Sequence, residues 1–126
     1  MRKILIISPL FEQWLPLIRL LRRLSYCVYI KPCSNRGLFT IQSMSFDLIL
    51  VEDELADMRG LQLISRIHSL KVRKKIIFFS KSYRLEEKIK TESLGINQYI
   101  AQSIGWVDTV ILVHRAMGDR NELCLN

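Results

Sequence analysis

The feature that most constrains this chain is a set of short apolar runs separated by longer stretches with helical spacing. The runs are four or five residues long, are rich in Ile, Val, Phe and Tyr, and show little alternation with polar residues. Strands that are buried on both faces of a parallel sheet have this composition. We therefore predict five strands, at residues 3–7, 26–30, 47–51, 75–79 and 98–101.

The stretches between these runs carry apolar residues at the spacing of one helix face. The second connection, residues 37–44, has the weakest helical pattern. Parallel strands must be joined by crossovers that cover both faces of a sheet, so the alternation predicts a doubly wound α/β fold. The apolar faces of the first, fourth and fifth helices are marked by Trp14, Leu17, Ile18 and Leu21, then Leu85, Ile89 and Leu94, then Val107, Val110, Ile111, His114 and Met117.

Length and composition indicate one compact domain. A chain of 126 residues can bury a complete core, and 49% hydrophobic residues with only 5 Gly and 3 Pro exclude a disordered or collagen-like chain. We expect the domain at residues 1–118 and a frayed tail at residues 119–126.

The same sequence predicts a cytoplasmic protein with reduced thiols. Its apolar runs fall short of the roughly 18 residues that a membrane-spanning helix needs, and the N-terminal run has no signal-peptide cleavage site. The three cysteines, Cys27, Cys33 and Cys124, form no CxxC pair, so neither a disulfide framework nor a zinc site is indicated.

The chain is basic, with 19 Lys and Arg against 12 Asp and Glu and a formal net charge of +7. Its basic clusters have no aromatic residues interleaved as stacking platforms, which makes nucleic acid a weak candidate partner and a solvated face the better interpretation. The clusters are Arg19, Arg22 and Arg23, and Lys71, Arg73, Lys74 and Lys75.

In doubly wound sheets the functional site lies beyond the C-terminal ends of the strands. The residues at those ends are the candidate site residues: Ser8 and Pro9, Glu52 and Asp53, Ser80 and Lys81, and Gln102 and Ser103.

Three stretches of this sequence resemble the receiver domains of two-component response regulators. The most specific stretch is residues 46–61, in which Met58 and Gly60 fix the register. The second and third matching stretches are residues 76–80 and 94–103. The resemblance covers nearly the whole chain. It implies a flavodoxin-like, five-stranded parallel sheet of strand order 2-1-3-4-5 with five helices.

The resemblance also implies roles for the strand ends, and most of the corresponding residues depart from the pattern. In an active receiver an acidic pair and an Asp hold Mg²⁺, while a Lys and a Ser or Thr contact the phosphoryl group. The positions here carry Ser8 and Pro9 for the acidic pair, Glu52 for the phosphoacceptor Asp, Gln102 for the Lys, and Ser80, which fits its role.

These departures predict a receiver whose phosphorylation site has been lost. Mg²⁺ prefers carboxylate oxygens, which Ser8 and Pro9 do not supply, and Gln102 has no charge to neutralise a phosphoryl group. Glu52 is one methylene longer than Asp, which misplaces the attacking oxygen. We therefore expect no Mg²⁺, no cofactor and no catalysis. We expect a role in two-component or phosphorelay signalling through protein contacts of the fourth helix, fifth strand and fifth helix.

Three alternatives stay open. A residual phosphoacceptor activity at Glu52 or Asp53 is the first, and a basic nucleic-acid-binding domain is the second. The third is a cation bound by the acidic cluster Glu52, Asp53, Glu54 and Asp57, although the cluster lacks the spacing of a calcium loop.

Two residues near the site have specific expectations. Lys81 follows Ser80 directly, so its side chain is expected to lie across the pocket mouth, approach Glu52 or Asp53, and close the site. Tyr99 occupies the position of the aromatic switch residue in the resembled family, which implies a two-state coupling with Ser80 or else a fixed side chain.

The last helix carries more apolar residues than one sheet-facing stripe needs. We expect the surplus to form an interaction surface for a signalling protein or for a second copy of this chain. Its residues are Trp106, Leu112 and Val113, with Tyr99 beside them.

Overall fold

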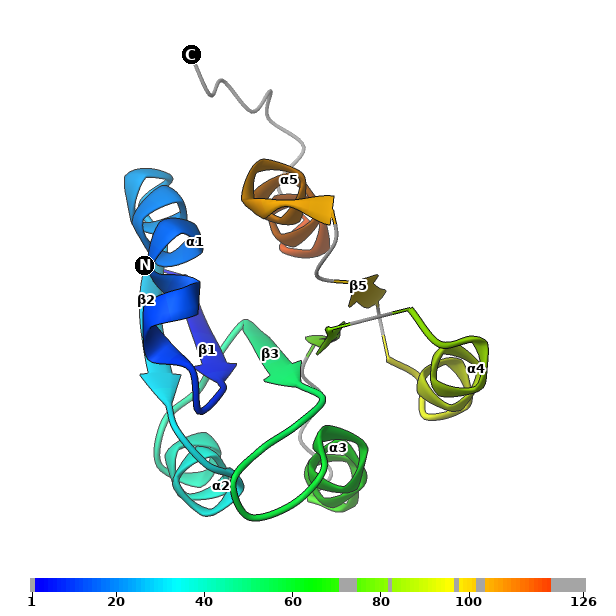
Figure 1. Cartoon of the computed structure of the whole chain (residues 1–126). Helices are drawn as coiled ribbons and strands as arrows, with labels where there is room; N and C mark the ends of the chain where they lie inside the picture. Colours follow the sequence, from blue (N-terminus) through cyan, green and yellow to red (C-terminus); the bar gives the residue numbers. More distant parts are fainter. Residues whose placement is uncertain (1, 71–74, 82, 97, 102–103, 119–126) are drawn as a thin grey trace.

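The computed structural model describes residues 2–70, 75–81, 83–96, 98–101 and 104–118. In those residues strands and helices alternate along the chain, as predicted (Figure 1). The elements are β1 (Lys3–Ile7), α1 (Phe11–Arg23), β2 (Cys27–Lys31), α2 (Ser34–Ser43), β3 (Leu48–Glu52), α3 (Gly60–Ser69), β4 (Lys75–Ser80), α4 (Leu85–Ser93), β5 (Gln98–Ala101) and α5 (Trp106–Ala116).

The five strands form one parallel sheet of order β2-β1-β3-β4-β5, which confirms the predicted flavodoxin-like topology. β3 is buried along its whole length, as the uninterrupted apolar run from Leu48 to Val51 predicts, and Glu52 at its end is buried as well. The register sets Glu52 opposite Phe79 and Ser80 opposite Ala101. The C-terminal ends of the strands therefore meet along one edge, where the candidate site lies.

Helices cover both faces of the sheet (Figure 1). Because side chains alternate along a strand, β1 contributes Ile4 and Ile6 to the core beneath α1 and α5, and Leu5 and Ile7 to the core beneath α2 and α3. Trp14 and the other predicted core residues of α1 are buried. The molecule therefore has two apolar layers, one on each side of the sheet.

The weak second helix is real and begins earlier than predicted. α2 starts at Ser34, and Gly37 lies against the sheet within it. A Cβ atom on Gly37 would come within 2.6 Å of Ile7 Cδ1, so a larger residue here would require the Ile7 side chain to shift. This buried glycine is invisible to a search for apolar spacing, which explains the weak helical pattern.

Two helices are rotated relative to the sequence prediction. Leu85 and Ile89 of α4 are 61% and 56% exposed, although their spacing predicted a buried face. On α5 the sheet-facing stripe runs through Val110 and Val113, which are fully buried, while Val107 is 53% exposed. Apolar residues surround most of α5, so spacing alone did not define which stripe faces the sheet.

Among the described residues, no helix is long and apolar enough to cross a membrane.

Candidate functional site

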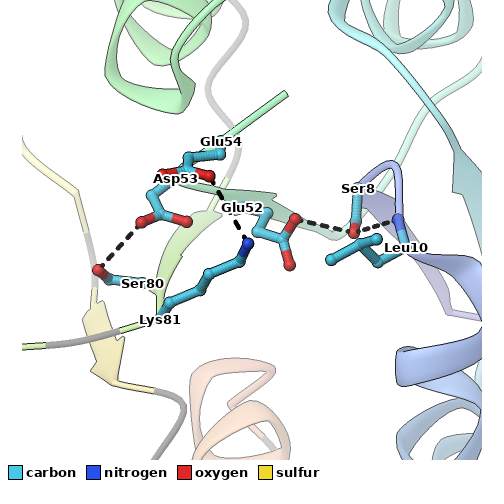
Figure 2. Close-up of polar contacts among 7 residues, drawn as sticks. All are labelled: Ser8, Leu10, Glu52, Asp53, Glu54, Ser80 and Lys81. Atoms are coloured by element: carbon cyan, nitrogen blue, oxygen red, sulfur yellow. Dashed lines mark hydrogen bonds and ion pairs between the residues drawn. The ribbon is translucent and has the colours of Figure 1, made fainter. Parts of the chain in front are cut away.

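The strand ends bring five of the predicted site residues together. Ser8 follows β1, Glu52 ends β3, Ser80 ends β4, and Asp53 and Lys81 continue from those ends (Figure 2). The parallel register between β3 and its neighbours creates this juxtaposition. Pro9 is exposed beside Ser8. Gln102 and Ser103 lie outside the described residues.

Ser8 is the centre of a buried hydrogen-bond network. Its side chain is 1% exposed, and its hydroxyl donates to Glu52 Oε2 over 3.1 Å. The same oxygen accepts hydrogen bonds from Trp14 Nε1 at 2.8 Å and from the backbone N–H of Leu10 at 3.1 Å. A hydroxyl group has one hydrogen and two lone pairs, so these three hydrogen bonds use all of its capacity.

Glu52 points toward Ser8 and into the protein (Figure 2). The residue is only 2% exposed. Burial raises the pKa of its carboxyl group above the ordinary value, and the neighbouring Asp53 carboxylate acts in the same direction. The hydrogen bond from Ser8 and the charge of Lys81 act to lower that pKa. The side chain that ends β3 is therefore an enclosed, hydrogen-bonded carboxyl group.

An aromatic cluster closes the inner side of this network. Trp14 is 1% exposed and lies 4.6 Å from Phe79 and 5.5 Å from Trp106, measured between ring centroids. Phe79 and Trp106 are stacked at 6.1 Å with an interplanar angle of 9°. The Trp14 indole therefore reaches Ser8 from a rigid apolar setting, which fixes the position of its N–H donor.

Asp53 points the opposite way from Glu52, toward β4 (Figure 2). Its Oδ2 atom accepts a long hydrogen bond from the Ser80 hydroxyl at 3.4 Å, and Ser80 is 1% exposed. Among the described residues, the buried Oδ1 atom of Asp53 has no hydrogen-bond partner. Asp53, and not Glu52, is thus the carboxylate that contacts Ser80.

Lys81 forms an ion pair with a different acid from the two that were predicted. Its Nζ atom lies 3.6 Å from Glu54 Oε2, and both side chains are substantially exposed, at 44% and 59%. Glu52 turns inward to Ser8 and Asp53 turns toward Ser80, while the charge of Lys81 still acts on Glu52. Closure of the site by Lys81 stays a prediction. Glu54 is the acid left at the outer rim, where exposed ion pairs contribute little stability.

The loop after β3 depends on a close backbone approach at Gly60. A Cβ atom at this position would lie 2.2 Å from the carbonyl oxygen of Glu52, and the Gly60 N–H donates to the carbonyl of Asp53 at 2.8 Å. The loop therefore folds back on the end of β3 and holds the backbone of Glu52 and Asp53 in place.

Asp57, in the same loop, caps α2. Its carboxylate accepts hydrogen bonds from the backbone N–H groups of Ser34 at 3.0 Å and Asn35 at 3.2 Å, and from the Ser34 hydroxyl. These hydrogen bonds, led by the one from the Ser34 side chain, lower the pKa of Asp57. The fourth acid of the predicted cation cluster is therefore engaged with a helix N-terminus.

Tyr99 is held by several partners at once. Its hydroxyl donates to Glu87 Oε1 at 2.8 Å and accepts from the backbone N–H of Arg84 at 3.1 Å, and its ring stacks on Phe78 at 5.7 Å. Burial raises the pKa of the phenol, while a hydrogen bond with Ser80 acts to lower it. Tyr99 and Ser80 are thus in contact, and their two-state coupling stays a prediction.

The predicted interaction surface on α5 needs correction. Val113 is fully buried against the sheet, and Leu112 is half-buried against the same core. Trp106 is half-buried and packs on Trp14 and Phe79. The larger exposed apolar side chains in this region lie at α4 instead: Tyr83, Leu85 and Ile89, at 56%, 61% and 56% exposure.

Two contacts of the site were missed by the sequence analysis: that of Trp14 with Ser8 and that of Asp57 with Ser34. Trp14 was assigned only to the core, although a buried indole N–H needs an acceptor and this requirement was a usable signal. The contact of Asp57 with Ser34 joins residues 23 positions apart, and no local pattern in the sequence indicates it.

The arrangement offers hydrogen bonds more readily than metal ligands. Among the residues that the structure describes, no group of three or more His, Cys, Asp or Glu side chains is arranged to hold a metal ion. Glu52 and Asp53 are adjacent in sequence, but their carboxylates point to different neighbours (Figure 2).

Comparison with known proteins gives the family. The response regulator receiver domain matches residues 16–111, which is more than half of the chain. The chain therefore belongs to the receiver domain family of two-component signal transduction. None of the curated proteins matches the sequence.

Solved structures agree on the fold. A CheY-like receiver domain protein from Methanospirillum hungatei is 24% identical, with a TM-score of 0.85 and 94% coverage of each chain. The non-phosphorylated HemR receiver domain from Leptospira biflexa is 17% identical, with a TM-score of 0.87, and the match covers 98% of this chain and 100% of that one. The third, TrrA from Thermotoga maritima in complex with Mg²⁺ and beryllium fluoride, is 18% identical, with a TM-score of 0.80, and the match covers 92% and 99%.

Proposed function

We propose that this receiver domain signals through protein contacts and without accepting a phosphoryl group. The observation that carries the proposal is the state of Ser8, which stands where the family's acidic pair begins. Its hydroxyl oxygen is saturated by hydrogen bonds to Glu52, Trp14 and Leu10. To ligate a cation it would have to give up one of these buried partners, which leaves a polar group unsatisfied.

The geometry at Glu52 supports the same conclusion. An in-line attack on a phosphodonor needs an accessible, ionised carboxylate, with its charge compensated by a metal ion or lysine. Glu52 is 2% exposed, its pKa is raised by burial, and it points to Ser8 and away from Ser80. The residues present do not fit the Mg²⁺ site of an active receiver.

Intact-mass measurement after incubation with acetyl phosphate and Mg²⁺ tests this proposal. We expect no mass increase, and no change in tryptophan emission on titration with Mg²⁺, because Trp14 lies within the hydrogen-bond network of the site. A gain of one phosphoryl group that maps to Glu52 would contradict it.

We further propose that partners dock on the outer face of α4. Leu85 and Ile89 are one helical turn apart and both exposed, and Tyr83 precedes them and packs edge-on against Tyr99 at 5.8 Å. An exposed apolar group of this kind on a small domain is typical of an interaction site. The partner is a signalling protein or a second copy of this chain.

The double substitution Leu85→Ser and Ile89→Ser should abolish self-association in sedimentation experiments, or binding to a partner that co-purifies with the native protein, with no loss of the folded state. A substitution at another exposed large apolar residue, Phe11→Ser, is the matched control, because Phe11 is 50% exposed on a different helix. Equal effects of both variants would contradict a specific α4 surface.

One observation favours a second candidate function, phosphoacceptance at Asp53. Its carboxylate contacts Ser80 and has one oxygen without a partner among the described residues. The mass experiment separates the two, because a phosphoryl group mapped to Asp53 and lost in Asp53→Asn would establish the second candidate.

A further inference from the structure

Positive charge is concentrated at one edge of this molecule. Residues 13–46 contain five of the 19 basic residues and none of the 12 acidic residues of the chain. They form most of α1, all of β2 and all of α2. β2 is an edge strand of the sheet, and α1 and α2 flank it on opposite faces (Figure 1). We call this surface the basic edge; its cations are Arg19, Arg22, Arg23, Lys31 and Arg36.

The cations are distributed along β2. Arg22 donates from Nη2 to the backbone carbonyl of Val28 at 3.4 Å, which holds its guanidinium beside the strand. Arg19 and Arg23 are exposed on the same helix. Lys31 ends the strand, and at 3.3 Å per residue it lies about 10 Å beyond Val28. The basic edge is therefore long enough to contact an extended segment at more than one point.

A hollow of about 300 Å³ lies at the α2 end of the basic edge, lined by Lys31, Asn35, Arg36, Phe39 and Thr40. Phe39 is 71% exposed, the highest value among the exposed large apolar side chains of the described residues. An occupant of this hollow would meet an aromatic ring and two cations together. It must therefore combine an apolar side chain with negative charge.

Within the described part of the chain, none of these five cations forms an ion pair with an acid. Asp57 reaches the N-terminus of α2 from the loop after β3, but its carboxylate is already hydrogen-bonded to Ser34 and Asn35. The charge complementarity of the basic edge is thus left for another molecule.

We propose that the basic edge is a second docking surface, which binds an acidic protein segment bearing an aromatic or aliphatic side chain. The apolar side chain packs on Phe39, and carboxylates of the segment pair with Arg36 and Lys31. This surface lies at the β2 edge, whereas α4 lies beside β5 at the opposite edge of the sheet (Figure 1). The domain can therefore hold two proteins at once, and the inference does not depend on the α4 surface.

Nucleic acid is the less favoured polyanion. Single-stranded nucleic acids are bound by successive aromatic side chains on which neighbouring bases stack. Within residues 13–46, Phe39 is the only large aromatic side chain that is exposed. One ring beside a hollow fits a single apolar side chain of a peptide better than a run of bases.

The test uses ¹⁵N-labelled full-length protein and three probes at about 0.05 M salt, where screening is weak. The probes are a polyglutamate peptide containing leucine and phenylalanine, a polyglutamate peptide of equal length and charge without them, and a single-stranded oligonucleotide. We expect the first peptide to bind most tightly and to shift the amide signals of Lys31, Asn35, Arg36 and Phe39.

Two variants and one control localise the site. Arg36→Glu and Phe39→Ser should each weaken binding of the first peptide about tenfold or more. The charge-matched control Arg66→Glu, on the exposed face of α3, should leave it nearly unchanged. Equal loss in the control, shifts confined to α4, tighter binding of the oligonucleotide, or no binding of either peptide would each overturn the proposal. None of these results depends on whether the domain is phosphorylated.

Discussion

Replacing Ser8 with Ala tests the buried network directly. The substitution removes the acceptor of the Trp14 indole N–H and the hydroxyl that donates to Glu52. Both residues are buried: Trp14 is 1% exposed and Glu52 is 2% exposed. A buried polar group that loses its partner costs about 1–3 kcal/mol, so two such losses predict a destabilisation of about 2–6 kcal/mol. The backbone N–H of Leu10 is only partly buried and can bond to water instead. This loss is a large fraction of the roughly 5–15 kcal/mol that stabilises a domain.

Urea unfolding, followed by circular dichroism and tryptophan emission, measures this loss. The matched control is Ser65→Ala, which removes an exposed hydroxyl that donates to the carbonyl of Leu61. We expect the control to change the free energy of unfolding by less than about 0.5 kcal/mol. The emission of folded Ser8→Ala should also shift, because the Trp14 indole loses its acceptor. A loss no larger than that of the control would refute the network as a source of stability.

Three further predictions concern the same edge of the sheet. The variant Glu52→Gln has no carboxyl group to ionise. In the wild type the pKa of Glu52 is raised in the folded state. The free energy of unfolding of the wild type therefore falls as pH rises from the ordinary value of 4.5 through the folded-state pKa. The advantage of the variant in urea midpoint should therefore grow over that range, and a pH-independent difference would contradict the buried carboxyl. Gly60→Ala should lose about 1–3 kcal/mol, since its Cβ would meet the Glu52 carbonyl oxygen at 2.2 Å; a thermal melt like that of wild type would refute this contact. Asp57→Ala should lose about 1 kcal/mol at neutral pH through its cap on α2. The pKa of Asp57 is lowered, so this loss should disappear as pH falls below the ordinary 3.8, and amide exchange at the start of α2 measures it.

The strands were predictable because uninterrupted apolar runs have few alternatives, and their order was what the resemblance to receiver domains implied. The run from Leu48 to Val51 in β3, with no polar residue to mark a solvent face, fits a strand buried on both sides. The positions of the strands rest on local sequence, whereas their order rests on the resemblance.

The contacts of individual side chains were less predictable. Val113 was assigned to the surface because α5 is apolar on most sides, and only the tertiary structure defines which stripe packs on the sheet. The ion pair of Lys81 with Glu54 was not predicted, because Glu52, Asp53 and Glu54 are consecutive and sequence does not specify which way each side chain turns. Glu54 was the remaining partner only after the first two had found Ser8 and Ser80.

The strength of these contacts differs between the two sides of the molecule, and this difference bears on how the domain could respond to a partner. Ser8 links the ends of β1 and β3 to α1, and Asp57 links the loop after β3 to α2. α4 has a weaker attachment, because Thr91 is its buried residue and its large apolar side chains face outward. Local rearrangement is easiest where few buried contacts are lost. A partner that prefers one conformation should therefore move α4 and its contacts to Tyr99, and leave the basic edge unchanged. If so, substitutions at Ile89 and Arg36 should change the binding free energy of a complex that uses both surfaces by additive amounts.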